Sequence, residues 1–195
     1  MRVRMKMDKA HVAQYIIGVD EVGRGPLAGP VAVCAVFCPR RELRKLRGIR
    51  DSKKLSAAQR EKWFAKCQSL NVVCSVSFVS AGVIDRAGIT NALKLAVRRS
   101  LAKLDRSCEV LLDGGLRAPK RFVNQRTIIR GDATEPIISL ASVIAKVLRD
   151  RLLVRLGRKY PGYGFEKHKG YGTRAHYEVL PKLGLSPIHR KTFIH

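Results

Sequence analysis

Long hydrophobic runs are missing from this sequence of 195 residues, although 46% of them are hydrophobic. A membrane-spanning helix needs at least ~18 consecutive apolar residues, so we expect none. The basic start over residues 1–9 lacks the apolar stretch and the small-residue cleavage site of a signal peptide. The hydrophobic content instead suits a folded domain, because a chain of this length can bury roughly 70% of its unfolded surface.

Paired cysteine motifs are missing as well. The five cysteines are an odd number, include no CxxC pair, and mostly lie within apolar stretches. This pattern predicts free buried thiols in a reducing compartment, and we expect the protein to be cytoplasmic. No Cys/His spacing matches a zinc site. The cysteines are Cys34, Cys38, Cys67, Cys74 and Cys108.

Acidic residues are scarce. Asp and Glu total 15 against 39 Lys and Arg, so the net charge is +24. Charge of one sign on this scale repels itself in the compact state, and a polyanion would relieve that repulsion. Nucleic acid is the first candidate partner, and an anionic membrane surface is the second. The alternative is a basic surface that water alone solvates.

The order of patterns along the chain predicts an α/β domain. Apolar, β-rich segments predict strands over residues 15–19, 31–37, 72–79, 110–112 and 127–129. Capped or amphipathic segments predict helices over residues 56–70, 89–104, 134–156 and 175–183, with Ser56 and Thr134 as N-caps. We therefore expect a mixed central sheet flanked by helices, with a C-terminal helical and loop portion packed beside it.

Two of the predicted strands end in acidic residues that glycine follows closely. Asp20 and Glu21 end the first of them and Asp113 ends the other, while Asp132 stands just before the long predicted helix. Strand ends in α/β sheets are where functional groups gather. Carboxylates held close together need cations, and Mg²⁺ or Mn²⁺ are the usual partners of oxygen ligands. Taken singly, each of these residues also fits a structural role in a turn or at the surface.

A family resemblance rests on these acidic residues and their surroundings. Residues 20–30, with the sequence DEVGRGPLAGP, resemble the N-terminal signature of type 2 ribonucleases H, the ribonuclease HII family. Four further blocks resemble motifs of that family and follow in its order, over residues 51–55, 141–150, 168–173 and 187–190. The blocks span nearly the whole chain, which is identified as a member of this family.

The resemblance implies a ribonuclease H-like fold and a metal-dependent endonuclease, a hydrolase of DNA replication and repair. The expected substrates are the RNA strand of RNA/DNA hybrids and ribonucleotides embedded in duplex DNA. Cleavage on the 5′ side of the ribonucleotide would leave 5′-phosphate and 3′-hydroxyl ends. No Ser/His/Asp or Cys/His triad is visible in the sequence, and this chemistry needs none.

Four carboxylates hold two divalent ions, Mg²⁺ or Mn²⁺, in enzymes of this family. By position, Asp20, Glu21 and Asp113 match the first three catalytic and metal-binding residues. We take Asp132 as the fourth, because it directly precedes the long helix as the family's fourth acidic residue does. Asp150 is the competitor, and an ion pair on the surface of that helix also explains it.

The resemblance also indicates which residues contact the substrate. The glycines of Gly23-Arg24-Gly25 would let the backbone approach the ribose 2′-hydroxyl, which distinguishes RNA from DNA. Tyr171 matches the family's tyrosine that packs against the sugar beside the cut. A tight turn and a core tyrosine are the structural alternatives. Residues expected to be structural or to contact phosphates are His168, His176 and His189.

Phosphate contacts are expected from the long predicted helix. Ser139, Ser142, Lys146 and Arg149 are spaced by 3, 4 and 3 residues and therefore share one helix face. We assign Ser142 and Lys146 to phosphates, with Arg149 as a further candidate; a solvated helix face is the alternative. Other phosphate candidates are Lys53, Lys54 and Lys169.

We expect one catalytic domain over residues 15–195, preceded by a basic arm over residues 1–14. We expect a monomer without the glutamine-led, double-aromatic tail that binds a sliding clamp. Two other functions stay open. A repair endonuclease on the same fold, cutting near deaminated bases, would also use clustered acidic residues and metal. A non-catalytic RNA-binding protein would explain the positive charge but not the acidic residues at the strand ends.

Overall fold

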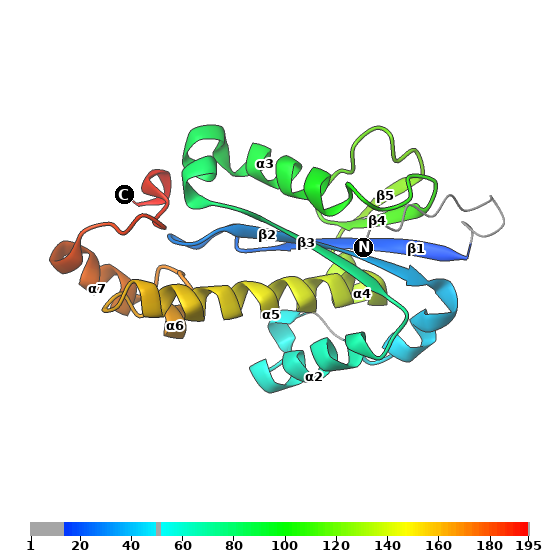
Figure 1. The fold of residues 1–195 in the computed structure, drawn as a ribbon, viewed down its shortest axis with the longest axis horizontal. Coiled ribbons are helices and arrows are strands. Elements are labelled where there is room, and N and C mark those ends of the chain that lie inside the picture. Colours follow the sequence, from blue (N-terminus) through cyan, green and yellow to red (C-terminus); the bar gives the residue numbers. More distant parts are fainter. Residues whose placement is uncertain (1–13, 50–51, 195) are drawn as a thin grey trace.

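A single mixed sheet forms the centre of the protein. The computed structural model describes residues 14–49 and 52–194, and Figure 1 shows the sheet edge-on. The strand order is β3-β2-β1-β4-β5. β1 (Tyr15–Val22) pairs antiparallel with β2 (Val31–Pro39) and parallel with β4 (Glu109–Asp113). β3 (Val73–Val79) extends the antiparallel side and β5 (Gln125–Ile128) extends the parallel side.

Helices cover both faces of this sheet (Figure 1). α3 (Ala81–Ser100) lies along one face, and α5 (Pro136–Lys159) lies along the other, with α2 (Ala57–Gln68) outside it. Short segments connect these layers, namely the 3₁₀ turns η1 (Arg40–Leu46) and η2 (Ser52–Lys54) and the one-turn helix α4 (Gly131–Thr134). The α/β architecture predicted from the sequence is confirmed.

The C-terminal portion packs at one end of α5, as predicted. It contains α6 (Phe165–His168), α7 (Arg174–Leu183) and the 3₁₀ turn η3 (Lys191–Phe193). Within the part of the chain that the structure describes, no helix is both long and apolar enough to cross a membrane. All five cysteines are free, and four are buried; Cys74 corrects the prediction because it lies exposed on the edge strand β3.

β1 separates two apolar cores, because successive side chains of a strand point to opposite faces. Ile17 and Val19 belong to the core under α3, and Ile16 belongs to the core under α5. Gly18 shares the face of Ile16, and a Cβ atom there would lie 2.6 Å from the backbone carbonyl of Ile137. The backbone of α5 therefore rests directly on β1, which brings the start of this helix beside the end of the strand.

Two helix starts differ from the prediction. Thr134 does not cap the long helix: it ends α4, and its hydroxyl donates to the carbonyl of Arg130 at 3.4 Å. α5 begins at Pro136, after a residue in extended conformation. α3 begins at Ala81, before the predicted start, but Gly88, with φ 76°, is not helical and separates an unpredicted first segment from the helical segment that begins at the predicted residue 89. The N-cap of α2 is confirmed, since Ser56 forms a complete capping box with Gln59.

Candidate active site

Three carboxylates meet at the ends of two neighbouring parallel strands. Val19 of β1 pairs with Leu112 of β4, so Asp20 and Asp113 stand one residue further along the same edge. One oxygen from each of Asp20, Glu21 and Asp113 lies within 4.8 Å of the others. The in-register parallel pairing thus assembles the acidic group that the sequence predicted.

The Asp20 carboxyl is the most enclosed of the three, with 4% of the residue exposed. Its Oδ1 accepts a hydrogen bond from the N–H of Glu21 at 2.7 Å. Burial raises the pKa of Asp20 well above its ordinary value, and the negative charges of Glu21 and Asp113 raise it further. A hydrogen bond from Ser142 opposes this shift, and the Ser142 hydroxyl also bonds to that of Ser52 at 2.7 Å.

Glu21 lies half-buried beside Asp20. Burial raises its pKa, while the Arg24 guanidinium, 3.1 Å from Oε1, lowers it. Its Oε2 atom is buried and has no hydrogen-bond partner among the described residues. An unsatisfied buried carboxylate oxygen is costly, and a cation would satisfy it. The donor set consists of hard oxygen ligands, which Mg²⁺ and Mn²⁺ prefer, so these residues fit a divalent metal.

The fourth acidic residue lies next to this group rather than within it. Asp132, in α4, is 8% exposed, and its N–H donates to Asp113 Oδ1 at 3.2 Å. Its Oδ2 is 3.7 Å from Lys53 Nζ. Asp150 lies on α5 and pairs with Lys146 at 2.9 Å, at the edge of an open groove. The helix-surface ion pair expected for Asp150 is present, with Lys146 as the partner.

The two elements expected to contact the ribose are adjacent. Gly23 is buried with φ 86°, and a Cβ atom there would lie 2.3 Å from Arg149 Nε, which explains why this position holds glycine. Arg24 and the following glycine are exposed. Tyr171 is 40% exposed, and the N–H of Ala28 donates to the carbonyl next to it, that of Gly170, at 3.2 Å. One backbone contact thus joins the loop after β1 to the Tyr171 loop.

The expected phosphate contacts divide into exposed and buried side chains. Lys53 and Lys54 are exposed, and Lys169 is half-buried. Ser142 is 4% exposed and lies between two partners beneath the acidic group. The interpretation of Arg149 as a phosphate contact is wrong, because its guanidinium has no exposed surface and donates to backbone carbonyls. Helical spacing identifies residues on one face but not whether that face meets water or protein.

The mixed sheet with carboxylates at the ends of β1 and β4 defines a nuclease of the ribonuclease H type, a hydrolase. The sequence matches the ribonuclease HII family model over residues 17–195. The chain therefore belongs to the ribonuclease HII family, whose members are metal-dependent and act on nucleic acid.

Curated relatives support this assignment. A ribonuclease HII of Caldicellulosiruptor bescii is 45% identical over 181 residues, which cover 93% of this chain and 87% of the relative. A ribonuclease HII of Bacillus thuringiensis strain Al Hakam is 46% identical over 179 residues, covering 92% of this chain and 68% of the relative.

Solved structures share the fold over almost the whole chain. The ribonuclease H2 of Pyrococcus horikoshii OT3 has a TM-score of 0.73 and 30% identity, covering 91% of this chain and 93% of that one. The ribonuclease HII of Archaeoglobus fulgidus, solved in a complex with PCNA, has a TM-score of 0.77 and 27% identity, covering 92% and 95%.

Proposed function

We propose that the protein hydrolyses the RNA strand of RNA/DNA hybrids and incises duplex DNA on the 5′ side of embedded ribonucleotides, leaving 5′-phosphate and 3′-hydroxyl ends. The observation that carries the proposal is the position of the acidic group. Asp20 and Glu21 end β1, and the exposed backbone of Arg24 and Gly25 follows directly. Groups that fit a metal thus adjoin a backbone that a sugar can approach closely.

Asp20, Glu21 and Asp113, with Asp132 beside them, would hold two divalent cations, Mg²⁺ or Mn²⁺. When bound, the cations would lower the pKa of a water molecule for attack on the phosphate and stabilise the departing 3′-oxygen. The protein's own part is to fix the ligands. Ser142 orients the Asp20 carboxyl, and the N–H of Asp132 holds Asp113 Oδ1.

Recognition of the ribose would come from the loop after β1 and from Tyr171. In the described residues, no hydrogen bond uses the N–H groups of Arg24 or Gly25, and both residues are exposed. Such free amides can bond to a 2′-hydroxyl, which carries the only sugar difference between RNA and DNA. The partly exposed Tyr171 ring offers an apolar surface for the neighbouring sugar.

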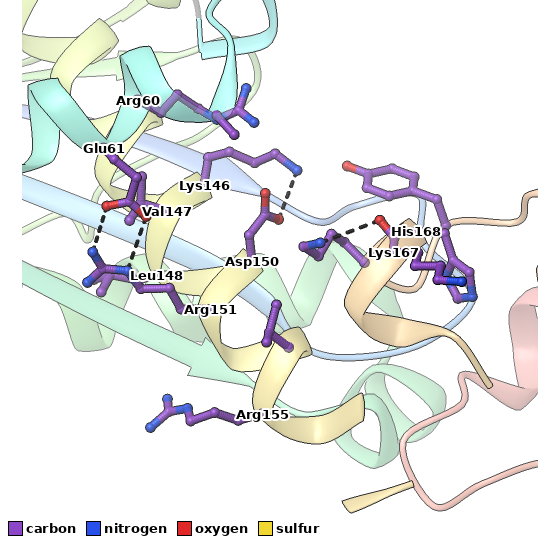
Figure 2. A pocket seen from close by; sticks show the side chains of 14 residues that line it. Arg60, Glu61, Lys146, Val147, Leu148, Asp150, Arg151, Arg155, Lys167 and His168 are labelled. Carbon is purple, nitrogen blue, oxygen red and sulfur yellow. Dashed lines mark hydrogen bonds and ion pairs between the residues drawn. The ribbon is translucent and has the colours of Figure 1, made fainter. Parts of the chain in front are cut away.

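A groove that Tyr171 helps to line supports a path for the nucleic-acid backbone; Figure 2 shows other residues that line it. It runs between α2, α5 and α6, and two acidic residues in it, Glu61 and Asp150, pair with Arg151 and Lys146. Cations outnumber these acidic residues, so the groove suits phosphates, whose contacts position a duplex without reading its sequence. The cationic side chains lining it are Arg60, Lys146, Arg151, Arg155, Lys167 and Lys169.

The test is cleavage of a duplex with one embedded ribonucleotide, with Mg²⁺ or Mn²⁺ and with EDTA. Asp113→Asn keeps the shape of the side chain but removes a negative ligand. We expect it to lower kcat by more than about 100-fold, the upper size of the effect of removing an outer partner of a metal site, while duplex binding persists. Asp132→Asn should be similarly sensitive, and the matched control Asp150→Asn should cost far less.

Three outcomes would contradict the proposal. Cleavage by Asp113→Asn at the wild-type rate would exclude the acidic group as the catalytic centre. Cleavage of an all-DNA duplex with a deaminated base, but not of the ribonucleotide duplex, would favour a repair endonuclease on the same fold. A non-catalytic RNA-binding protein would show no metal-dependent cleavage of either duplex.

A further inference from the structure

Two arginines form the floor beneath the loop after β1. Arg149 of α5 and Arg190, which precedes η3, are the largest side chains without exposed surface in the described part of the chain. Neither forms an ion pair with a described carboxylate; each guanidinium instead donates only to backbone carbonyls. Burying a cation without a counter-charge is costly, even when hydrogen bonds compensate. General packing stability is therefore a poor reason for two such residues at one place.

Arg190 holds the loop that is expected to meet the ribose. Its Nη2 donates to the carbonyl of Gly23 at 2.7 Å and its Nη1 to that of Arg24 at 2.8 Å. Its Nε donates to the carbonyl of Gly29 at 2.9 Å. One planar guanidinium thus fixes three peptide groups of the same loop, which a lysine ammonium cannot reproduce in this forked geometry.

Arg149 joins the same loop to the segment that carries Tyr171. Its Nε and Nη2 donate to the carbonyls of Pro30 and Ala28 at 2.9 and 3.2 Å. Its Nη1 donates at 3.0 Å to the carbonyl of Lys169, which precedes Tyr171 by two positions. The two arginines therefore hold both elements that we expect to contact the sugar.

These contacts determine where the free amides of the loop point. In a trans peptide, the C=O of one residue and the N–H of the next point in opposite directions. Because the carbonyls of Gly23 and Arg24 point toward the buried Arg190, the N–H groups of Arg24 and Gly25 point away from it. Both residues are exposed, so these amides point away from the protein interior.

The segment around Arg190 also holds the Tyr171 loop, through two buried histidines. The N–H of Ser186 donates to His189 Nδ1 at 2.8 Å, so the proton of neutral His189 is on Nε2. That Nε2 lies 3.0 Å from His176 Nε2, whose Nδ1 lies 2.9 Å from the carbonyl of Tyr171. Only one pair of tautomers satisfies all three hydrogen bonds. In it, His189 Nε2–H donates to His176 Nε2, and His176 Nδ1–H donates to the Tyr171 carbonyl.

We propose that Arg190, together with Arg149, is a positioning residue that aims the backbone amides of Arg24 and Gly25 at the 2′-hydroxyl. This inference rests on the proposed function. It makes the segment from Ser186 to Arg190, which the sequence places far from the acidic residues, part of the ribose-recognition machinery. Arg190 touches no reacting atom; it acts through the loop that it holds.

The test uses two duplexes of identical sequence that differ by one 2′-hydroxyl. With the full chain and Mg²⁺, we measure KM for cleavage of the ribonucleotide duplex and Ki of the all-DNA duplex as its inhibitor. The ratio of Ki to KM reports recognition of the hydroxyl and does not depend on how much enzyme is active. Arg190→Met and Arg190→Lys should each reduce this ratio by about tenfold, as the loss of a hydrogen bond or its alignment predicts.

The matched control is Arg126→Met, which removes an exposed arginine that pairs with Glu109 at the opposite end of β4. This control should keep the wild-type ratio. If Arg190→Met does not fold, Arg190→Lys and Arg149→Lys give the same measurement. A folded variant at Arg190 with lowered Vmax and an unchanged ratio would overturn the inference but leave the proposed function intact. A wild-type ratio of one would also overturn the inference, whereas a wild-type protein that did not cleave the ribonucleotide duplex would overturn the proposed function.

Discussion

Tyr171 lies between cations and open solvent. The Lys146 ammonium and the Arg149 guanidinium are 5.6 and 5.9 Å from the centre of its ring. Cations near an aromatic face are attracted by its quadrupole, so the ring is held in place while two-fifths of the residue stays exposed. A fixed, partly open ring suits packing against a sugar better than a mobile one.

We expect Tyr171→Ala to reduce kcat/KM for a single embedded ribonucleotide more than for a long RNA/DNA hybrid. The ring packs best against a deoxyribose that lacks the extra oxygen, and only the first substrate has an RNA-to-DNA junction. The ratio of the two kcat/KM values should change by about three- to tenfold, the worth of an aromatic contact. Tyr171→Phe and Tyr177→Ala, which removes an exposed tyrosine of α7, should preserve it. Equal losses of kcat/KM on both substrates would mean that Tyr171 supports the site but does not recognise the RNA-to-DNA junction.

For single residues, the sequence predicted which acidic residues gather at the strand ends better than it predicted the buried residues around them. Asp20 and Asp113 stood out because acidic residues at the ends of apolar strands are unusual. Arg149 carried no comparable signal, since spacing along a helix does not reveal that a cation will be buried against carbonyls. The role of Arg190 depends on a contact across 167 positions of sequence, which no local pattern encodes.

The contact between β1 and α5 brings Asp132, which lies in α4 just before α5, close to the acidic residues at the strand ends. Gly18 leaves no space for a side chain, because an added Cβ atom would overlap the backbone of Ile137. α5 also carries Ser142, which bonds to Asp20, and it follows α4, which carries Asp132. A displacement of this helix would therefore disturb the site as well as the core.

We expect Gly18→Ala to lower the free energy of unfolding by about 1–3 kcal/mol, the usual cost of overpacking, and to lower kcat. Gly82→Ala is the matched control, because its nearest described neighbour, a terminal nitrogen of Arg86, would lie 3.5 Å from the new Cβ atom. That change should be neutral or slightly stabilising. Urea denaturation measures both variants. A Gly18→Ala protein within 0.5 kcal/mol of wild type, roughly the effect of a neutral surface change, would refute the close packing.

The buried pair of His176 and His189 makes the C-terminal portion sensitive to acid. Burial, then the neighbouring His176, lowers the pKa of His189 to about 4, whereas an unfolded histidine has a pKa near 6.5. Between these values the unfolded chain binds more protons, so the free energy of unfolding falls as the pH falls through this range. Below about pH 4 the contribution, at most ~3 kcal/mol, is fully lost.

His189→Gln should therefore shrink the difference between the free energies of unfolding at pH 7 and pH 4.5. Carboxylates also titrate over this range, but they are common to both proteins and cancel in the comparison with wild type. Denaturant titrations at the two pH values provide the measurement. An identical pH dependence in the variant would show that His189 is not a neutral buried group.

Element boundaries were predictable where local chemistry marks them and not elsewhere. Ser56 has its capping partner three residues on, and Gly184 ends α7, so both boundaries follow from the sequence. Gly88 interrupts α3 with φ 76°, and the segment of α3 before it was not predicted. The sequence shows no sign of α4, the single turn that carries Asp132 between β5 and α5. Its position depends on the contact of Asp132 with Asp113, which no local pattern shows.

At the scale of the whole molecule, the charge of +24 predicts binding that weakens steeply with salt. Each phosphate contact contributes a slope of roughly −0.9 to the plot of log K against log salt for B-form DNA. Lys146→Ala should weaken binding to hybrid and DNA duplexes alike and make the slope shallower by about one contact. Arg98→Ala, an equal charge change on α3 across the sheet, should leave the slope unchanged. If the Lys146→Ala variant kept the wild-type slope of log K against log salt, Lys146 would not be a phosphate contact.

The partnership of Gly23 with Arg190 has a consequence for the order in which the protein is made. Synthesis produces β1 and its acidic residues well before Arg190, and contacts between such distant positions form late because closing a long loop costs entropy. A nascent chain can therefore already contain its carboxylates before Arg190 forms its hydrogen bonds to the loop after β1. If Arg190 positions this loop as we propose, discrimination between ribose and deoxyribose requires that synthesis has passed Arg190, 167 positions after Gly23.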